Sequence, residues 1–109
     1  MEKAINKTDH SVTVLDEKGK GITTFPSKGE IRINEETLFV KEIGRGVKIV
    51  ETVFTPKDEL PKKIKGIYYI VSSKVKKAFP ERDDFLVPSC IVRDNNRRVI
   101  GCRFLNKSV

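Results

Sequence analysis

The side chains in this sequence best suited to chemistry are three arginines in separate segments of its second half. Arg82, Arg93 and Arg103 each carry a planar fork of N–H donors that matches a phosphate or a carboxylate. A compact sheet could bring the three together. Two interpretations stay open at this point. The arginines form internal ion pairs with carboxylates such as Asp83 and Asp84, or they converge on a bound anion, and carboxylates can also hold arginines in place for a ligand.

Two serines stand where a strand gives way to a helix. Ser72 and Ser73 follow the apolar residues 67–71. The first turn of a helix gathers free amide donors and partial positive charge, so a phosphate could bind there, but simple N-capping explains the same residues. The segment has no glycine-rich loop and therefore no nucleotide-binding fingerprint of the Walker or dinucleotide type.

Catalytic and metal chemistry have little support in the sequence. His10, the only histidine, would have to lie beside Cys90 or Cys102 to activate a nucleophile. A metal site built from His10 and aspartates lacks the spacing of known ligand sets. We therefore predict a protein that is not an enzyme and needs no metal or cofactor. Both cysteines are predicted to be reduced, buried packing residues.

Alternating apolar and polar residues dominate the first half of the chain. A period of two is typical of half-buried β-strands. The alternation covers residues 12–14, 31–33, 38–40 and 47–52. Segments with glycine or proline lie between them and predict tight turns, because these residues supply the backbone angles that turns need. These segments are residues 16–21, 26–29 and 44–46.

The second half predicts one short helix among strands. Val75, Ala78 and Phe79 fall on one helical face, and Pro80 limits the helix to residues 73–79. Beyond it, residues 85–87, 90–92 and 99–105 are predicted to be extended, with a tight turn at residues 95–96. The fold class is therefore mainly β, an antiparallel sheet or small barrel of about eight strands with one short helix.

Length and charge set further limits. A chain of 109 residues is expected to form a single domain, residues 1–109. No apolar run is long enough to span a bilayer and no secretory signal is evident, so we expect a cytoplasmic protein. Residues 1–55 carry nine basic and nine acidic side chains, whereas residues 56–109 carry thirteen and six. This excess favours an anionic partner, either a small molecule or a nucleic acid, although a lysine-rich face is often only solvated.

Several motifs near the two ends of the chain occur in a particular order. They are Asn6-x-Thr8-x-His10, Tyr69-Ile70-Val71-Ser72, Pro80-Glu81-Arg82-Asp83-Asp84, Val92-Arg93-Asp94 and Ile100-Gly101-Cys102-Arg103. In this order they resemble a group of small proteins from bacteriophages and prophages. The members carry proline where Asp9 stands and glycine in the turn where Asn96 and Arg97 stand. Residues 22–61 show no such resemblance.

The resemblance implies a function. Small phage proteins of this kind commonly disarm host defences without catalysis, some by trapping nucleotide-derived immune signals in pockets shared between subunits. It would make this chain a homo-oligomeric binding protein in the host cell cytoplasm, and the alternative is a nucleic-acid-binding or structural phage accessory protein. The predicted ligand-binding residues are Asn6, Thr8, His10, Ser72, Ser73, Arg82, Asp83, Arg93 and Arg103.

Overall fold

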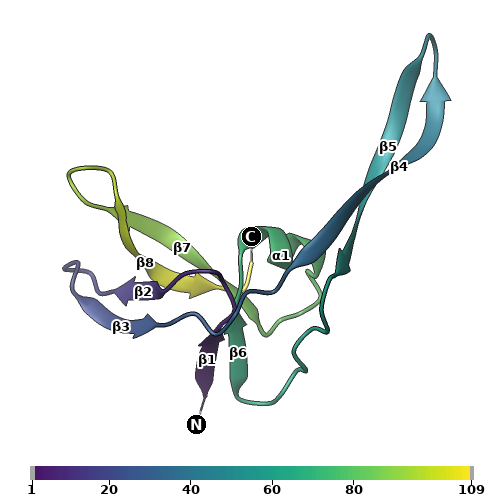
Figure 1. The fold of residues 1–109 in the computed structure, drawn as a ribbon. Coiled ribbons are helices and arrows are strands. Elements are labelled where there is room, and N and C mark those ends of the chain that lie inside the picture. Colours follow the sequence, from purple (N-terminus) through teal and green to yellow (C-terminus); the bar gives the residue numbers. More distant parts are fainter. Residues whose placement is uncertain (1, 109) are drawn as a thin grey trace.

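The computed structural model describes residues 2–108, and its secondary structure is mainly β (Figure 1). The strands are β1 (Lys3–Asn6), β2 (Val12–Leu15), β3 (Gly21–Phe25), β4 (Ile33–Ile43), β5 (Val47–Pro56), β6 (Ile67–Ile70), β7 (Phe85–Arg93) and β8 (Val99–Asn106). A short helix, α1 (Ser73–Ala78), connects β6 to β7. The predicted fold class and the predicted short helix are confirmed.

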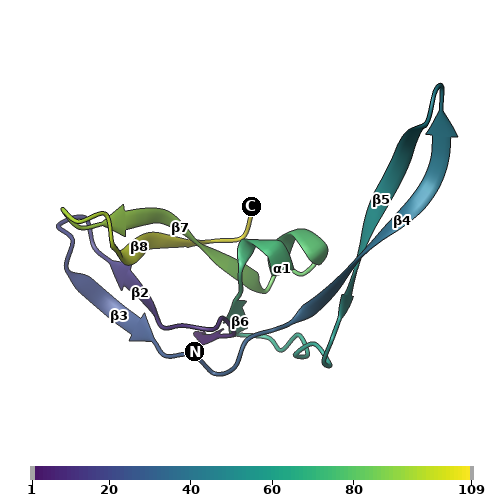
Figure 2. The same ribbon diagram turned by 45° about the horizontal axis from the view of Figure 1, so that its top comes forward.

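Six of the strands form one curved sheet. Their order is β1-β6-β7-β8-β2-β3, and a parallel bridge between Asn6 and Ser27 brings the two ends of the sheet together. The sheet is therefore a nearly closed barrel (Figures 1 and 2). It is not purely antiparallel, because β6 runs parallel to both β1 and β7, and β2 runs parallel to β8. A tight turn can join only antiparallel neighbours, so these parallel pairs need longer connections, as α1 provides between β6 and β7.

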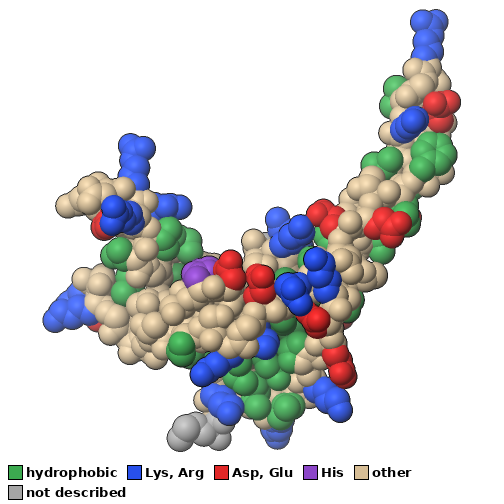
Figure 3. All heavy atoms as spheres, in the orientation of Figure 1, with side chains coloured by type: hydrophobic (Ala, Val, Ile, Leu, Met, Phe, Trp, Pro, Cys, Tyr) green, Lys and Arg blue, Asp and Glu red, His purple; other side chains and the backbone are tan. Residues whose placement is uncertain are grey.

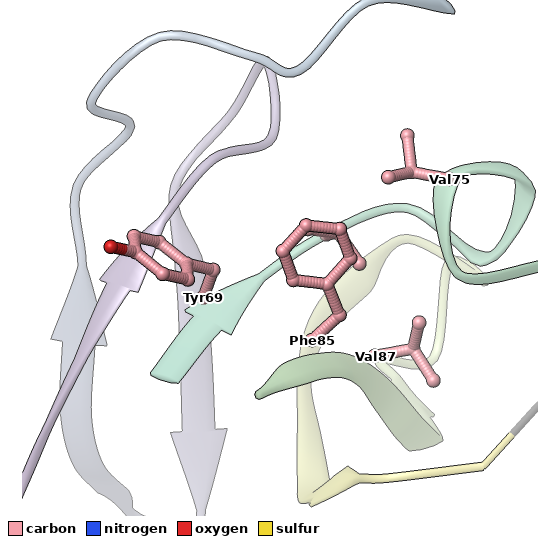
Figure 4. Close-up of a cluster of buried hydrophobic side chains, with 5 residues drawn as sticks. Tyr69, Val75, Phe85 and Val87 are labelled. Carbon is pink, nitrogen blue, oxygen red and sulfur yellow. The ribbon is translucent and has the colours of Figure 1, made fainter. Parts of the chain in front are cut away.

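Strand β6 forms the centre of the core because both of its faces are buried. Tyr69 packs edge-on against Phe85, with ring centroids 6.2 Å apart, in a cluster that also contains Val75 and Val87 (Figure 4). Ile70, on the other face, is completely buried in a second cluster. A strand that has parallel neighbours on both sides and is buried on both faces typically has a continuous run of apolar residues, as residues 67–71 do.

Helix α1 is fixed at both ends by local interactions. The Ser72 hydroxyl accepts a hydrogen bond from the Val75 amide at 3.3 Å, so Ser72 is the N-cap. The helix ends before Pro80, as expected. Lys76 is buried in the second turn and its Nζ donates to the carbonyl of Arg82 at 2.6 Å, which ties the helix to the segment that leads into β7.

Strands β4 and β5, with the turn between them, form a separate two-stranded hairpin, which we call the arm (residues 33–56). The arm projects far beyond the barrel (Figures 1 and 2). It accounts for a radius of gyration of 17.3 Å, compared with roughly 13 Å for a compact chain of about this length. The expectation of half-buried strands is therefore wrong here, because nearly every arm residue is exposed.

Two further predictions concern the burial of the two cysteines and the absence of a membrane-spanning segment. Cys102 is buried as predicted, but Cys90 is exposed. It lies in β7 with a positive φ of 56°, where the strand bends, and this turns its side chain out of the core. None of the described helices is long and apolar enough to cross a membrane.

Candidate functional site

A pocket of about 460 Å³ opens beside the junction of β2 and β8. We call it the β2–β8 pocket. It is lined by His10, Ser11, Val12, Thr13, Pro88, Ile91, Arg93, Val99, Ile100, Gly101 and Cys102. Apolar side chains make up most of this lining, no carboxylate belongs to it, and its volume falls in the range of small-molecule sites. Two of the predicted ligand-binding residues, His10 and Arg93, belong to this lining although they are far apart in the sequence.

The loop that carries His10 is held by a buried polar cluster. Asn6 Nδ2 donates at 2.8 Å to the carbonyls of both His10 and Phe25, while its Oδ1 accepts from the Thr8 amide at 2.9 Å. The Thr8 hydroxyl lies 2.6 Å from Asn6 Oδ1. Asn6 and Thr8 are buried, so they are not placed to touch a ligand. They act instead on the backbone of His10, and this explains why the three residues occur together in the motif.

The His10 ring is exposed and oriented by its neighbour. Its Nδ1 lies 2.7 Å from the Asp9 carboxylate, and this hydrogen bond lowers the pKa of the Asp9 carboxyl below its usual value of 3.8. With Nδ1 engaged, Nε2 is the nitrogen that can face a ligand. Asp9 thus sets the orientation of the imidazole.

Arg93 reaches the pocket from the far end of β7. Its Nη1 donates to the carbonyl of Arg97 at 3.0 Å, and no ion pair to a carboxylate is formed by Arg93 within residues 2–108. The turn that follows is closed by Asp94, whose Oδ1 accepts from the amides of Asn96 and Arg98. Arg97 adopts a positive φ of 63°, a conformation that favours glycine. This turn therefore holds a guanidinium at the pocket without neutralising it.

The wall of the pocket depends on the close approach of β8 to β2. A Cβ on Gly101 would lie 2.7 Å from the Thr13 carbonyl and 2.9 Å from Leu15 Cγ, which is closer than real side chains come. Only glycine therefore fits at this position. The requirement accounts for the glycine in Ile100-Gly101-Cys102-Arg103.

Cys102 lines the inner part of the pocket and is buried. Burial is the main cause that raises the pKa of its thiol above the usual 9.0. A thiol in this state carries little thiolate at neutral pH and is a poor nucleophile. The arrangement is suited to packing rather than to attack on a ligand.

Arg82 lies far from this pocket and already has partners. It precedes β7, whereas Arg93 ends it, and a nine-residue strand spans roughly 26 Å. The Arg82 guanidinium donates twice to Asp84 at 2.8 Å and once to the Pro61 carbonyl at 2.7 Å, and its Cζ lies 4.3 Å from the centroid of the Phe85 ring. The expected convergence of three arginines is therefore not found, and Arg82 forms the internal ion pair that was the alternative.

The remaining predicted residues are also apart from the pocket. Asp83 is exposed and pairs with Lys63 Nζ at 2.5 Å. Ser72 caps α1, and Ser73 is exposed in its first turn. Arg103 follows Cys102 in β8, so it points to the opposite face of the strand, and its Cζ lies 6.0 Å from the Phe104 ring centroid. Ser72, Ser73, Arg82, Asp83 and Arg103 do not form one site with His10 and Arg93.

Sequence reasoning missed the apolar side of the pocket. Ile91, Val99 and Ile100 line it while remaining about half exposed. In a strand pattern these residues look like ordinary core positions. The signal that could have singled them out is Gly101, because a glycine inside a strand often marks a close backbone approach.

Comparisons with known proteins found no relative of this chain. No protein-family model matches it, and neither a curated protein nor a solved structure matches it significantly. Within residues 2–108 no group of three or more histidine, cysteine, aspartate or glutamate side chains is arranged to hold a metal ion.

Proposed function

We propose that this protein is a non-enzymatic binding protein that holds an anionic, nucleotide-like small molecule in the β2–β8 pocket. The observation that carries the proposal is that His10 and Arg93 both line a pocket whose lining contains no carboxylate. A phosphate would contact the Arg93 guanidinium and the His10 ring. The apolar side chains of Ile91 and Ile100 would pack against a base or another ring.

Binding without turnover agrees with the chemistry of the lining residues. The Cys102 thiol has a raised pKa, and the group that orients His10 is an exposed carboxylate on the adjacent residue. A nucleophile with a buried, well-oriented base is the usual requirement for covalent catalysis. The resemblance to phage proteins adds the further proposal that the ligand is a nucleotide-derived immune signal of the host.

Thermal denaturation in the presence of candidate ligands tests this proposal. The probes are AMP, ADP-ribose, cyclic dinucleotides and inorganic phosphate. A ligand present at 100 times its Kd stabilises the folded state by about 2.7 kcal/mol, and we expect at least one nucleotide to raise the melting temperature by about 10 °C. Chromatography of the heat-released ligand should recover it unchanged.

Variants locate the binding site. Arg93→Ala and His10→Ala should abolish the shift in melting temperature, because each removes a group that contacts the anion. Arg98→Ala is the matched control, since it removes an exposed arginine from the same turn but not from the pocket lining. The proposal fails if no probe stabilises the protein, or if Arg93→Ala and Arg98→Ala respond to the ligand alike.

A second candidate is nucleic-acid binding, favoured by one feature. Arg93, Arg97 and Arg98 are exposed together around the turn between β7 and β8, and basic side chains cluster over that turn in Figure 3. Contacts from such residues would bind phosphates irrespective of sequence. This function predicts retardation of DNA or RNA that weakens steeply with salt, and that is lost in Arg98→Ala as much as in Arg93→Ala.

A further inference from the structure

Within residues 2–108, the arm has no partner strand along either of its outer edges. β4 and β5 pair only with each other, over ten registered pairs from Ile33–Pro56 to Ile43–Val47. At about 3.3 Å per residue, this hairpin is roughly 33 Å long. An isolated two-stranded hairpin is marginally stable in water, and three or more strands are usually needed for stability. We therefore expect a hairpin of this length to need additional strands for its stability.

Apolar side chains cover the arm on both faces. Residues paired across the two strands share a face, so Phe39 and Val50 form one exposed apolar pair and Ile43 and Val47 form another. Phe39 is 62% exposed and Val50 52%. The exposed apolar residues of the arm are Leu38, Phe39, Val40, Ile43, Val47, Val50 and Val53. Such a concentration of exposed apolar side chains marks an interaction surface.

The two outer edges differ in their ability to accept another strand. The pairing shifts between Phe39 and Lys41, which leaves Val40 as an extra residue in β4. A bulge of this kind disrupts regular pairing and protects an edge. β5 contains no bulge, and its proline, Pro56, is its last residue. The β5 edge is therefore the one open to a further strand.

Charge is distributed unequally along the arm. The half next to the barrel, residues 33–39 and 50–56, carries three glutamates and no basic residue; they are Glu35, Glu36 and Glu51. The outer half, residues 40–49, carries three basic residues and one acidic residue; they are Lys41, Arg45, Lys48 and Glu42. Glu35 already pairs with Lys74 of α1, which leaves Glu36 and Glu51 available. One end of the arm is therefore complementary to the other end of an identical arm.

We propose that two copies of this chain pair through their arms, with β5 running antiparallel to β5 of the second copy around a twofold axis. The four strands would form one sheet, and the apolar pairs at its centre would be covered. The basic outer half of each arm would lie against the acidic inner half of its mate, as an isologous interface requires. This inference is independent of the ligand proposed above.

Sedimentation velocity of the full chain at 1–100 µM tests this interface. The wild-type protein should be a dimer. Lys48→Glu should raise the dimer Kd at least tenfold, because it sets a glutamate against the acidic half of the mate. Adding Glu51→Lys should restore the Kd to within about threefold of the wild-type value. Lys65→Glu makes the same change of charge at an exposed position outside the arm and should leave the Kd unchanged.

A cross-linking experiment tests the twofold geometry. Val50 is near the middle of β5, so in a Cys90→Ser background a short bismaleimide reagent should link Val50→Cys to the same residue of its mate, whereas Thr23→Cys, exposed in β3, should not be linked. A monomer at 100 µM overturns the proposal. A dimer insensitive to Lys48→Glu, failure of Glu51→Lys to rescue, or a monomer that binds lipid vesicles or another protein through the arm also overturns it. Ligand binding by a monomeric variant would leave the proposed function intact.

Discussion

At the scale of single residues, the ion pair between Arg82 and Asp84 shows how an arginine that could bind a ligand serves the fold instead. The Asp84 side chain is 4% exposed and that of Arg82 17%. The hydrogen bonds from Arg82 are the main cause that lowers the pKa of the Asp84 carboxyl below its usual value of 3.8. Asp83, one residue away, makes its ion pair in solvent. The two adjacent carboxylates thus have different roles, because the Asp84 side chain faces the protein interior and that of Asp83 faces solvent.

Asp84→Asn should destabilise the protein by about 3 kcal/mol, because it leaves a partly buried guanidinium without its carboxylate. Urea denaturation at pH 7 measures this change. Asp83→Asn is the matched control and should change stability by less than about 1 kcal/mol, since an exposed ion pair contributes little. Equal losses in the two variants would contradict this account of Asp84.

The same pair predicts a dependence on pH. A carboxyl whose pKa is lower in the folded state stabilises the protein fully above its unfolded pKa, and this contribution disappears as the pH falls through the folded value. The wild-type protein should therefore lose its advantage over Asp84→Asn as the pH is lowered from 5 to below 3.8. A difference in stability that stays constant over this range would argue against a charged Asp84.

At the scale of secondary-structure elements, the contact between β2 and β8 decides whether the pocket exists. Only Val14 and Cys102 are registered between these strands, so little backbone pairing holds them together. The two strands are also held together by the close approach at Gly101 and by the buried cluster of Val12, Ile70 and Cys102. The His10 loop, fixed by Asn6, immediately precedes the same strand β2.

Gly101→Ala should destabilise the protein by about 1–3 kcal/mol and weaken ligand binding, because the added methyl forces β8 away from the Thr13 carbonyl. Thermal denaturation and ligand titration measure the two effects. Gly21→Ala is the matched control, because a Cβ there would meet only Thr13 Cγ2 at an ordinary 3.8 Å. A Gly101→Ala variant as stable as Gly21→Ala would show that the two strands can separate without cost.

At the scale of the whole molecule, the arm and the rest of the chain differ in net charge and in the burial of their apolar residues. The arm carries four acidic and three basic residues, so the net charge of +7 comes entirely from the rest of the chain. The arm also carries seven of the exposed large apolar residues and contributes none of the buried core residues. Both core clusters lie in the barrel, and Ile33, the first residue of the arm, is the arm's contribution to them. We therefore expect the barrel to fold without the remainder of the arm.

Replacing residues 34–55 by Asn-Gly should leave a folded barrel. Ile33 and Pro56 are registered partners, so a two-residue turn can join them. The shortened chain should unfold cooperatively and have a radius of gyration of roughly 12 Å by small-angle scattering. It should also be monomeric if the arms form the dimer. A loss of cooperative unfolding would mean that the arm contributes to the core more than its contacts indicate.

Most of the local structure of this protein follows from its amino-acid sequence. The alternation of residues identified strands, Pro80 and the serines set the limits of α1, and Gly44 and Gly46, both with positive φ, form the turn between β4 and β5. These features depend on neighbours in the chain, so their physical causes can be read there. The separation of the arm from the barrel could not be read in this way, because strands in solvent and strands in a core share the same period.

The surroundings of the polar residues, in contrast, depend on the three-dimensional arrangement of the strands. The sequence contains the same arginine fork at residues 82, 93 and 103. Arg82 pairs with the carboxylate of Asp84, whereas Arg93, at the end of β7, lines the pocket together with His10. The closure of the sheet and the approach of β8 to β2 at Gly101 determine these surroundings. They depend on contacts between distant segments, which local spacing does not specify.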